Sequence, residues 1–94
     1  MGGSLKMQIA EKILVGNPAG LHLRGAVKLV LLVDRYKSNI IILKGFRQVN
    51  ARSIIGVMGL CASIGTELEF VFEGEDAEEA RDEIRAFFEQ DFGE

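Results

Sequence analysis

Apolar and polar positions alternate along two stretches of this chain, and the alternation predicts two half-buried strands. The first stretch runs from Met7 to Val15, and its residues of one parity are Met7, Ile9, Ile13 and Val15. In the second stretch, Leu68, Phe70 and Phe72 share one face, while Glu69, Val71 and Glu73 share the other. Each strand should therefore bury one side against a core.

A pair of shorter strands is expected between these two. Ile40 to Leu43 is a β-branched run, Lys44 to Arg47 contains a glycine and reads as a turn, and Gln48 to Ala51 forms a short return strand. The pattern is typical of a β-hairpin.

The remaining apolar positions recur with helical spacing. A helix is predicted from His22 to about Tyr36, and its buried stripe is expected to consist of Ala26, Val27, Val30, Val33 and Tyr36. A short helical stretch opens at Ser53 and should end between Cys61 and Gly65. In the last helix, Asp76 is the predicted N-cap, with Glu79 completing a capping box. Its predicted stripe is Ala77, Ala80, Ile84, Phe87 and Phe88.

The order of elements is therefore β-α-β-β-α-β-α. Strands with one apolar face and amphipathic helices predict an α+β fold, in which helices cover one face of a four-stranded antiparallel sheet and the other face is solvated. With 94 residues and 48% hydrophobic content, the chain should form a single domain over residues 7–94. Residues 1–6 are expected to be a flexible N-terminal extension.

Charge is distributed unevenly along the sequence. The net charge of −3 argues against a general nucleic-acid surface. Acidic residues gather between Glu67 and Glu94, whereas cations dominate the first half of the chain. That half should therefore attract an acidic partner.

Other residue types exclude several function classes. The single cysteine, Cys61, cannot form an internal disulfide, and its apolar neighbours predict that it is buried. One histidine and one cysteine, far apart in sequence, make no local metal-ligand set, and we expect neither a metal nor a cofactor. The longest apolar run, Leu29 to Val33, is too short to cross a bilayer. We therefore expect a soluble, cytoplasmic protein.

The one histidine, His22, follows Asn17-Pro18-Ala19-Gly20-Leu21 and directly precedes the first predicted helix. Near neutral pH, an imidazole keeps one nitrogen free to attack phosphorus. Free amides at the helix start, the helix dipole and Arg24 would all favour the negative charge of the product. His22 is therefore a candidate phosphoryl acceptor, although a lone histidine more often only caps or packs against a helix.

Two motifs in this order of elements resemble the HPr phosphocarrier proteins of the bacterial phosphotransferase system. They are Gly20-Leu21-His22-Leu23-Arg24 and the segment from Val49 to Met58 that contains Ser53. The resemblance spans about residues 7–88 and implies an HPr-like open-faced β-sandwich with three helices on one face.

The resemblance also implies a function. His22 would accept a phosphoryl group on Nδ1 from enzyme I and pass it to a IIA protein or domain, with Arg24 stabilising the charge. Ser53 matches a regulatory serine that an HPr kinase phosphorylates in some bacteria, although a serine there can also simply cap a helix. The residues that match the family's docking surface are Leu23, Ile54, Ile55 and Met58. Such a carrier is a monomer that serves as substrate and donor rather than as a stand-alone enzyme.

Gly25 departs from the resemblance, because many members of the sugar branch have proline there, while relatives in the nitrogen branch (NPr-like) often have a small residue. The nitrogen branch therefore stays an alternative, and a small-ligand-binding regulatory module is the alternative from another class. If Gly25 lies in the first helical turn with an unpaired N–H, proline at this position should be tolerated.

Overall fold

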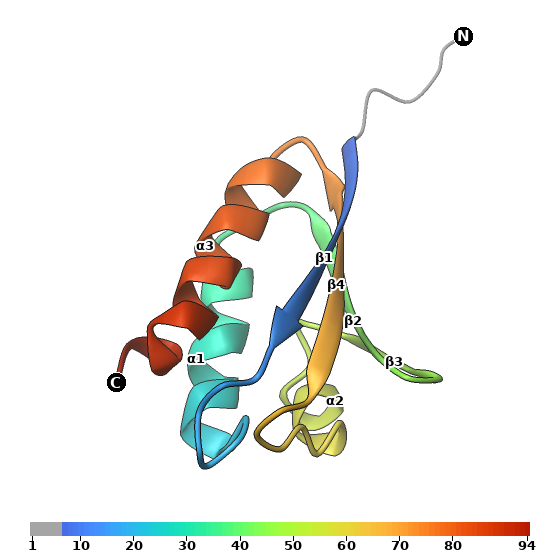
Figure 1. The fold of residues 1–94 in the computed structure, drawn as a ribbon. Helices are drawn as coiled ribbons and strands as arrows, with labels where there is room; N and C mark the ends of the chain where they lie inside the picture. Colours follow the sequence, from blue (N-terminus) through green and yellow to red (C-terminus); the bar gives the residue numbers. More distant parts are fainter. Residues whose placement is uncertain (1–6) are drawn as a thin grey trace, which may run out of the picture.

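Four strands form one antiparallel sheet in the order β1-β4-β2-β3 in the computed structural model, which describes residues 7–94 (Figure 1). The flexible extension predicted for residues 1–6 lies outside the described residues. The elements are β1 (Met7–Leu14), α1 (Leu23–Val33), β2 (Asn39–Lys44), β3 (Arg47–Asn50), α2 (Ile54–Gly59), β4 (Glu67–Gly74), α3 (Ala77–Glu89) and a 3₁₀ helix, η1 (Asp91–Gly93). The predicted order is confirmed, and η1 is additional.

The helices lie on one side of this sheet. α1 and α3 run side by side along its face, and α2 lies at the end of the sheet where α1 begins (Figure 1). Register explains which side is covered, because Ile13 pairs with Leu68 and Ile42 with Phe70, and all four side chains point into the core. The predicted open-faced architecture is therefore confirmed.

The core consists of large apolar side chains from the sheet, the helices and η1. Its largest fully buried members are Phe70, Phe72, Phe92, Leu29, Ile40, Ile42, Leu60, Leu68, Ile84, Val15, Val33 and Val57. Each contributes about 1.5–3 kcal/mol through burial. Phe92 lies in η1, beyond α3, so the end of the described chain belongs to this core.

The predicted stripe of α1 was partly wrong. Leu29 is fully buried, although it was left out of the stripe, whereas Val27 is exposed. The helix also ends at Val33, and Tyr36 lies beyond it. Every residue from Leu29 to Val33 is apolar, so the pattern does not show which side of the helix faces the core.

Asp76 occupies the predicted N-cap position of α3, but its side chain makes no capping hydrogen bond. The carboxylate instead accepts hydrogen bonds from the amides of Lys37 and Ser38, at 2.8 and 2.9 Å, and from the Ser38 hydroxyl. These donors lie between α1 and β2. The predicted capping box is therefore replaced by a tie between the start of α3 and the segment before β2.

The burial predicted for Cys61 was also wrong, since the residue is exposed. α2 ends at Gly59, earlier than predicted, and Cys61 then adopts a left-handed backbone with φ 52°. Lys44 donates hydrogen bonds to the carbonyls of Leu60 and Cys61 at this turn. Leu60 and Ala62 point into the core, so the cysteine between them faces solvent.

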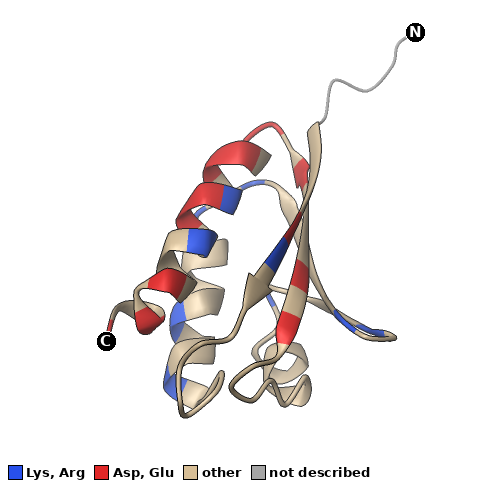
Figure 2. Cartoon of the chain, viewed as in Figure 1, with Lys and Arg blue, Asp and Glu red and all other residues tan. Residues whose placement is uncertain are grey.

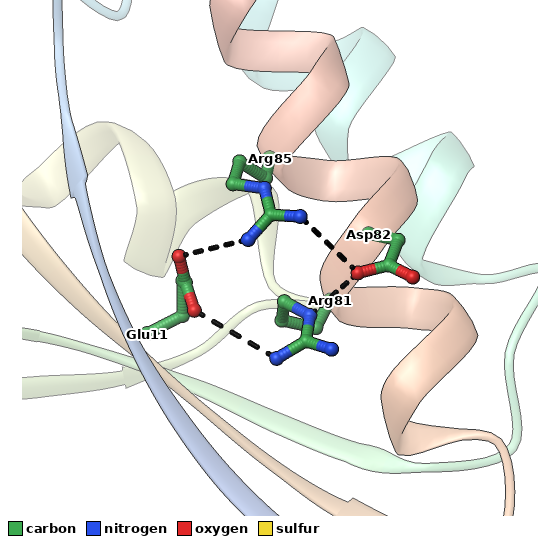
Figure 3. Close-up of polar contacts among 4 residues, drawn as sticks. All are labelled: Glu11, Arg81, Asp82 and Arg85. Atoms are coloured by element: carbon green, nitrogen blue, oxygen red, sulfur yellow. Dashed lines mark hydrogen bonds and ion pairs between the residues drawn. The ribbon is translucent and has the colours of Figure 1, made fainter.

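An ion-pair network holds α3 against β1. Glu11 of β1 lies between Arg81 and Arg85, with O···N distances of 3.9 and 3.3 Å, and Asp82 contacts both arginines (Figure 3). Partly exposed pairs of this kind contribute little stability individually. Their geometry nevertheless ties the middle of α3 to β1.

The tie made by Asp76 predicts a pH-dependent loss of stability. Burial opposes ionisation of this carboxyl, but the hydrogen bonds from Ser38 and Lys37 outweigh it and lower its pKa from the ordinary 3.8. Its contribution is therefore present above that ordinary value and is lost as the pH falls through the lower pKa of the folded protein. We expect Asp76→Ala to reduce the unfolding free energy at pH 7 by about 1–3 kcal/mol.

Urea denaturation of the parent and of Asp76→Ala between pH 7 and pH 2 measures this effect. Asp34→Ala is the matched control, because Asp34 is an exposed carboxylate directly after α1 that takes no part in the tie. The difference between parent and Asp76→Ala should shrink in acid. A difference that stays constant over this pH range would mean that the charge of Asp76 is not what stabilises the tie.

Candidate functional site

The loop between β1 and α1 is anchored to the chain that follows α2. The amide of Leu21 donates to the carbonyl of Ala62 at 2.8 Å, and the Asn17 side chain accepts from the amide of Ala19 at 2.8 Å. Gly20 adopts φ +71°, and a Cβ at this position would lie 2.7 Å from the Ala62 oxygen. Glycine is required there by both backbone angle and space. The loop thus delivers His22 to a fixed place.

His22 is the N-cap of α1. Its backbone is extended, with φ −81° and ψ 176°, and its carbonyl accepts from the amide of Ala26 at 2.8 Å. The ring Nδ1 accepts from the amide of Gly25 at 3.2 Å. The predicted position of the histidine at the junction of loop and helix is therefore confirmed, and the side chain is 27% exposed.

The end of the described chain packs against the same imidazole. The ring of Phe92 meets His22 edge to face with centroids 5.7 Å apart, and Glu94 Oε1 lies 3.4 Å from His22 Nε2. Lys28 donates to the carbonyl of Phe92 at 3.3 Å. The sequence pattern did not reveal these partners, because they lie beyond the last helix and carry no periodic signal.

The contacts on the two ring nitrogens agree on one proton position. Nδ1 accepts from the Gly25 N–H, so it presents its lone pair, and the proton of the neutral ring is therefore on Nε2, where the Glu94 carboxylate lies 3.4 Å away. In this tautomer Nδ1 is the nitrogen that can act as a nucleophile.

The first turn of α1 offers further groups to an anion. The amides of Leu23 and Arg24 precede the first i→i−4 hydrogen bond of the helix, and the positive end of its dipole lies at this turn. Arg24 is exposed, and within residues 7–94 its guanidinium forms no hydrogen bond or ion pair. It is therefore available to a ligand.

Ser53 is the N-cap of α2, and its hydroxyl accepts from the amide of Gly56 at 3.0 Å. The capping role considered for this serine is confirmed. The residue is also exposed, so its hydroxyl remains accessible from solvent.

The four residues expected to form a docking surface differ in exposure. Leu23 and Ile55 are 61% and 82% exposed, whereas Ile54 and Met58 are partly buried against the core. α1 and α2 contact one another, so the two helices form a continuous surface. Sequence reasoning missed Val27 and Leu31, which are exposed at successive four-residue steps from Leu23 along α1. That spacing is the signal that could have found them.

Charge separates along the fold as the sequence predicted. Basic residues lie on α1 and on the β2–β3 hairpin. Most acidic residues lie on β4, on α3 and in the turn that joins β4 to α3 (Figure 2). Arg24 and Lys28 place positive charge beside His22. The exposed end of α1 therefore combines apolar side chains with cations, which suits an acidic partner.

Other features of the described chain bear on the alternatives. Within residues 7–94, no helix is long and apolar enough to cross a membrane, and no group of three or more His, Cys, Asp or Glu could hold a metal ion. A hollow of about 570 Å³ is lined by residues that include Lys37, Asn39 and Arg52. The Arg52 guanidinium already bonds the carbonyls of Tyr36 and Ser38, so it is not free for a small anionic ligand.

Gly25 does not behave as the sequence suggested. Its N–H has a partner, Nδ1 of His22, and a Cβ on this residue would lie 2.8 Å from Cδ2 of the Phe92 ring. Proline would remove the donor and bring its ring into that contact. The expectation that proline is tolerated at position 25 is therefore wrong.

Comparisons with known proteins point to one family. Residues 9–90 match the family model described as the PTS HPr component phosphorylation site. The chain is 38% identical over 86 residues to the phosphocarrier protein HPr of Treponema pallidum (strain Nichols), covering 92% of this chain and 98% of that protein. It is 30% identical to the phosphocarrier protein NPr of Shewanella violacea, covering 93% and 96%. The crystal structure of HPr-C-His from Thermoanaerobacter tengcongensis superposes with a TM-score of 0.87 at 36% identity, covering 92% and 97%.

The fit of Phe92 over Gly25 predicts that even one added methyl group is costly. We expect Gly25→Ala to lower the unfolding free energy by about 1–3 kcal/mol, because the buried ring has to move. Gly16→Ala is the control, since a Cβ there would meet nothing within 4 Å. Equal stability of the two variants in urea denaturation would show that Phe92 does not press on residue 25 in solution.

Proposed function

Because the chain belongs to the HPr family of phosphocarrier proteins of the phosphotransferase system, we propose that His22 accepts a phosphoryl group from enzyme I and passes it to a IIA protein or domain. The observation that carries the proposal is the placement of Nδ1 at the N-terminus of α1, beside the Gly25 amide. The protein acts as a substrate and donor of the phosphoryl group, not as a stand-alone catalyst, and functions as a cytoplasmic monomer.

The transfer needs only the groups described at the site. The lone pair of Nδ1 forms a bond to phosphorus, while the bond between phosphorus and its donor atom breaks and its electron pair stays with the donor. Nε2 keeps its proton, so the phosphorylated ring is an imidazolium. The Gly25 amide, released from the lone pair, can then donate to a phosphoryl oxygen, as can the free amides of Leu23 and Arg24.

Arg24 supplies the mobile part of this anion site. Its guanidinium has no partner within residues 7–94, so it can swing to the phosphoryl oxygens without breaking an existing contact. A charge-assisted hydrogen bond of this kind contributes about 1.5–3 kcal/mol to the phosphorylated state. We therefore assign Arg24 the role of stabilising the charge.

Partners dock on the surface formed by α1 and α2. Leu23, Ile54, Ile55 and Met58 provide its apolar part, with Val27 and Leu31 extending it along α1. Exposed aliphatic side chains beside a partly buried methionine and flanking cations suit transient binding to more than one acidic partner.

The sugar branch is the favoured setting. The HPr of Treponema pallidum is 38% identical to this chain, whereas the NPr of Shewanella violacea is 30% identical. A regulatory phosphocarrier of the nitrogen branch is the alternative, with the same chemistry at His22. Gly25 does not separate the two, because the structure explains it by the packing of Phe92.

The direct test is transfer of labelled phosphate from phosphoenolpyruvate through enzyme I. His22→Ala should take up no label, because it lacks the nucleophile, and should keep its circular dichroism spectrum, because the imidazole is only partly buried. Ser63→Ala, which changes an exposed serine outside the site, is the control and should take up label like the parent. Label that persists in His22→Ala would refute the assignment.

Regulation through Ser53 predicts an electrostatic effect. Ser53→Asp adds negative charge to the docking surface and should slow phosphorylation of His22 by about threefold to tenfold at low salt. Raising the salt concentration should reduce the difference. Ser53→Ala removes the hydroxyl without adding charge and should leave the rate close to that of the parent. If the Asp and Ala variants are equally fast at low salt, Ser53 acts only as the N-cap of α2.

A further inference from the structure

The last described residues are built into the site rather than extending away from it. Figure 1 shows the chain turning back after α3 so that its end lies beside the start of α1. Phe92 is 1% exposed, and its ring contacts those of Phe87 and Phe88 as well as that of His22. The segment is therefore anchored by core packing.

The backbone of this segment is held in a conformation that ordinary residues rarely adopt. Asp91 and Phe92 have φ values of 53° and 61°, in the left-handed region. Such angles cost free energy and persist only where the surroundings impose them. Here the buried ring of Phe92 and the hydrogen bond from Lys28 to its carbonyl impose them.

Gly25 makes room for the Phe92 ring. The Phe92 ring occupies the space that a side chain at position 25 would fill, with Cδ2 and Cε2 at 2.8 and 3.1 Å from an ideal Cβ. The absence of a side chain therefore lets Phe92 reach His22. Phe92 in turn sets the position of Glu94, two residues further on, whose carboxylate meets Nε2 at 3.4 Å.

We propose that Glu94 is a positioning residue for phosphoryl transfer at His22: its carboxylate, delivered by Phe92 over Gly25, lies against Nε2 and favours the neutral tautomer in which Nε2 holds the proton and Nδ1 keeps its lone pair. This inference rests on the proposed function and adds a residue to it. The amide of Gly25 holds one side of the imidazole, and Glu94 holds the other. A carboxylate behind a histidine fixes the tautomer and stabilises the imidazolium, as in other nucleophilic sites.

The group-transfer step shows where Glu94 acts. As Nδ1 bonds to phosphorus and the donor keeps the electron pair of the broken bond, the ring gains a positive charge, because Nε2 retains its proton. Glu94 faces that charge directly. Two cations of α1 also lie near the site: Arg24 follows His22 by two residues, and Lys28 is bonded to the carbonyl of Phe92.

The effect on the ring can be measured before any phosphate is added. Nitrogen chemical shifts of His22 in ¹⁵N-labelled protein should show protonation at Nε2 in the parent. They should show a larger share of the Nδ1–H form in Glu94→Ala. Glu89→Ala removes an exposed carboxylate from the end of α3 and should leave the shifts unchanged.

The same proteins are then phosphorylated with enzyme I and phosphoenolpyruvate. Glu94→Ala should accept phosphate about threefold to tenfold more slowly than Glu89→Ala. Equal rates would overturn the proposal, and so would a slower rate with unchanged nitrogen shifts, because Glu94 would then act on docking and not through the ring. If the parent itself takes up no phosphate, the proposed function fails, while the nitrogen shifts still decide whether Glu94 positions His22.

Discussion

The hydrogen bond from the Gly25 amide to Nδ1 of His22 joins the start of a helix to the reactive atom of the candidate site. An N-cap side chain normally serves only to satisfy a free amide. Here the capping atom is a ring nitrogen, so the geometry that stabilises α1 also orients a nucleophile and surrounds it with donors. On phosphorylation, the Gly25 amide would lose the Nδ1 lone pair as its acceptor and could donate to a phosphoryl oxygen instead.

The rest of the fold keeps that junction in position. The loop before His22 is tied to Ala62, beyond α2, and the network around Glu11 ties α3 to β1 (Figure 3). After α3, Phe92 and Glu94 contact His22 at the start of α1. Segments that are far apart in sequence therefore converge on one imidazole. The acidic residues lie mainly on α3 and β4, whereas both charged residues of α1, Arg24 and Lys28, are basic (Figure 2).

The sequence predicted most of the architecture because the strands alternate cleanly and the turn residues are distinctive. It also located His22 at the helix start and Ser53 as an N-cap, because both positions follow from local signals. It placed Leu29 and Val27 wrongly, since a run of apolar residues carries no helical phase. Asp76 was assigned a local role, but its donors come from residues about 38 positions earlier. Phe92 and Glu94 were missed for the same reason, because their roles exist only through packing with α1.

The most direct measurement is the identity of the phosphorylated atom. The protein is labelled with ¹⁵N at its single histidine, phosphorylated with enzyme I and phosphoenolpyruvate, and studied by ³¹P and ¹⁵N NMR. The geometry predicts one phosphorus signal coupled to Nδ1 of His22, with the proton retained on Nε2. Phosphorus bound to Nε2, or to no histidine nitrogen at all, would contradict the account.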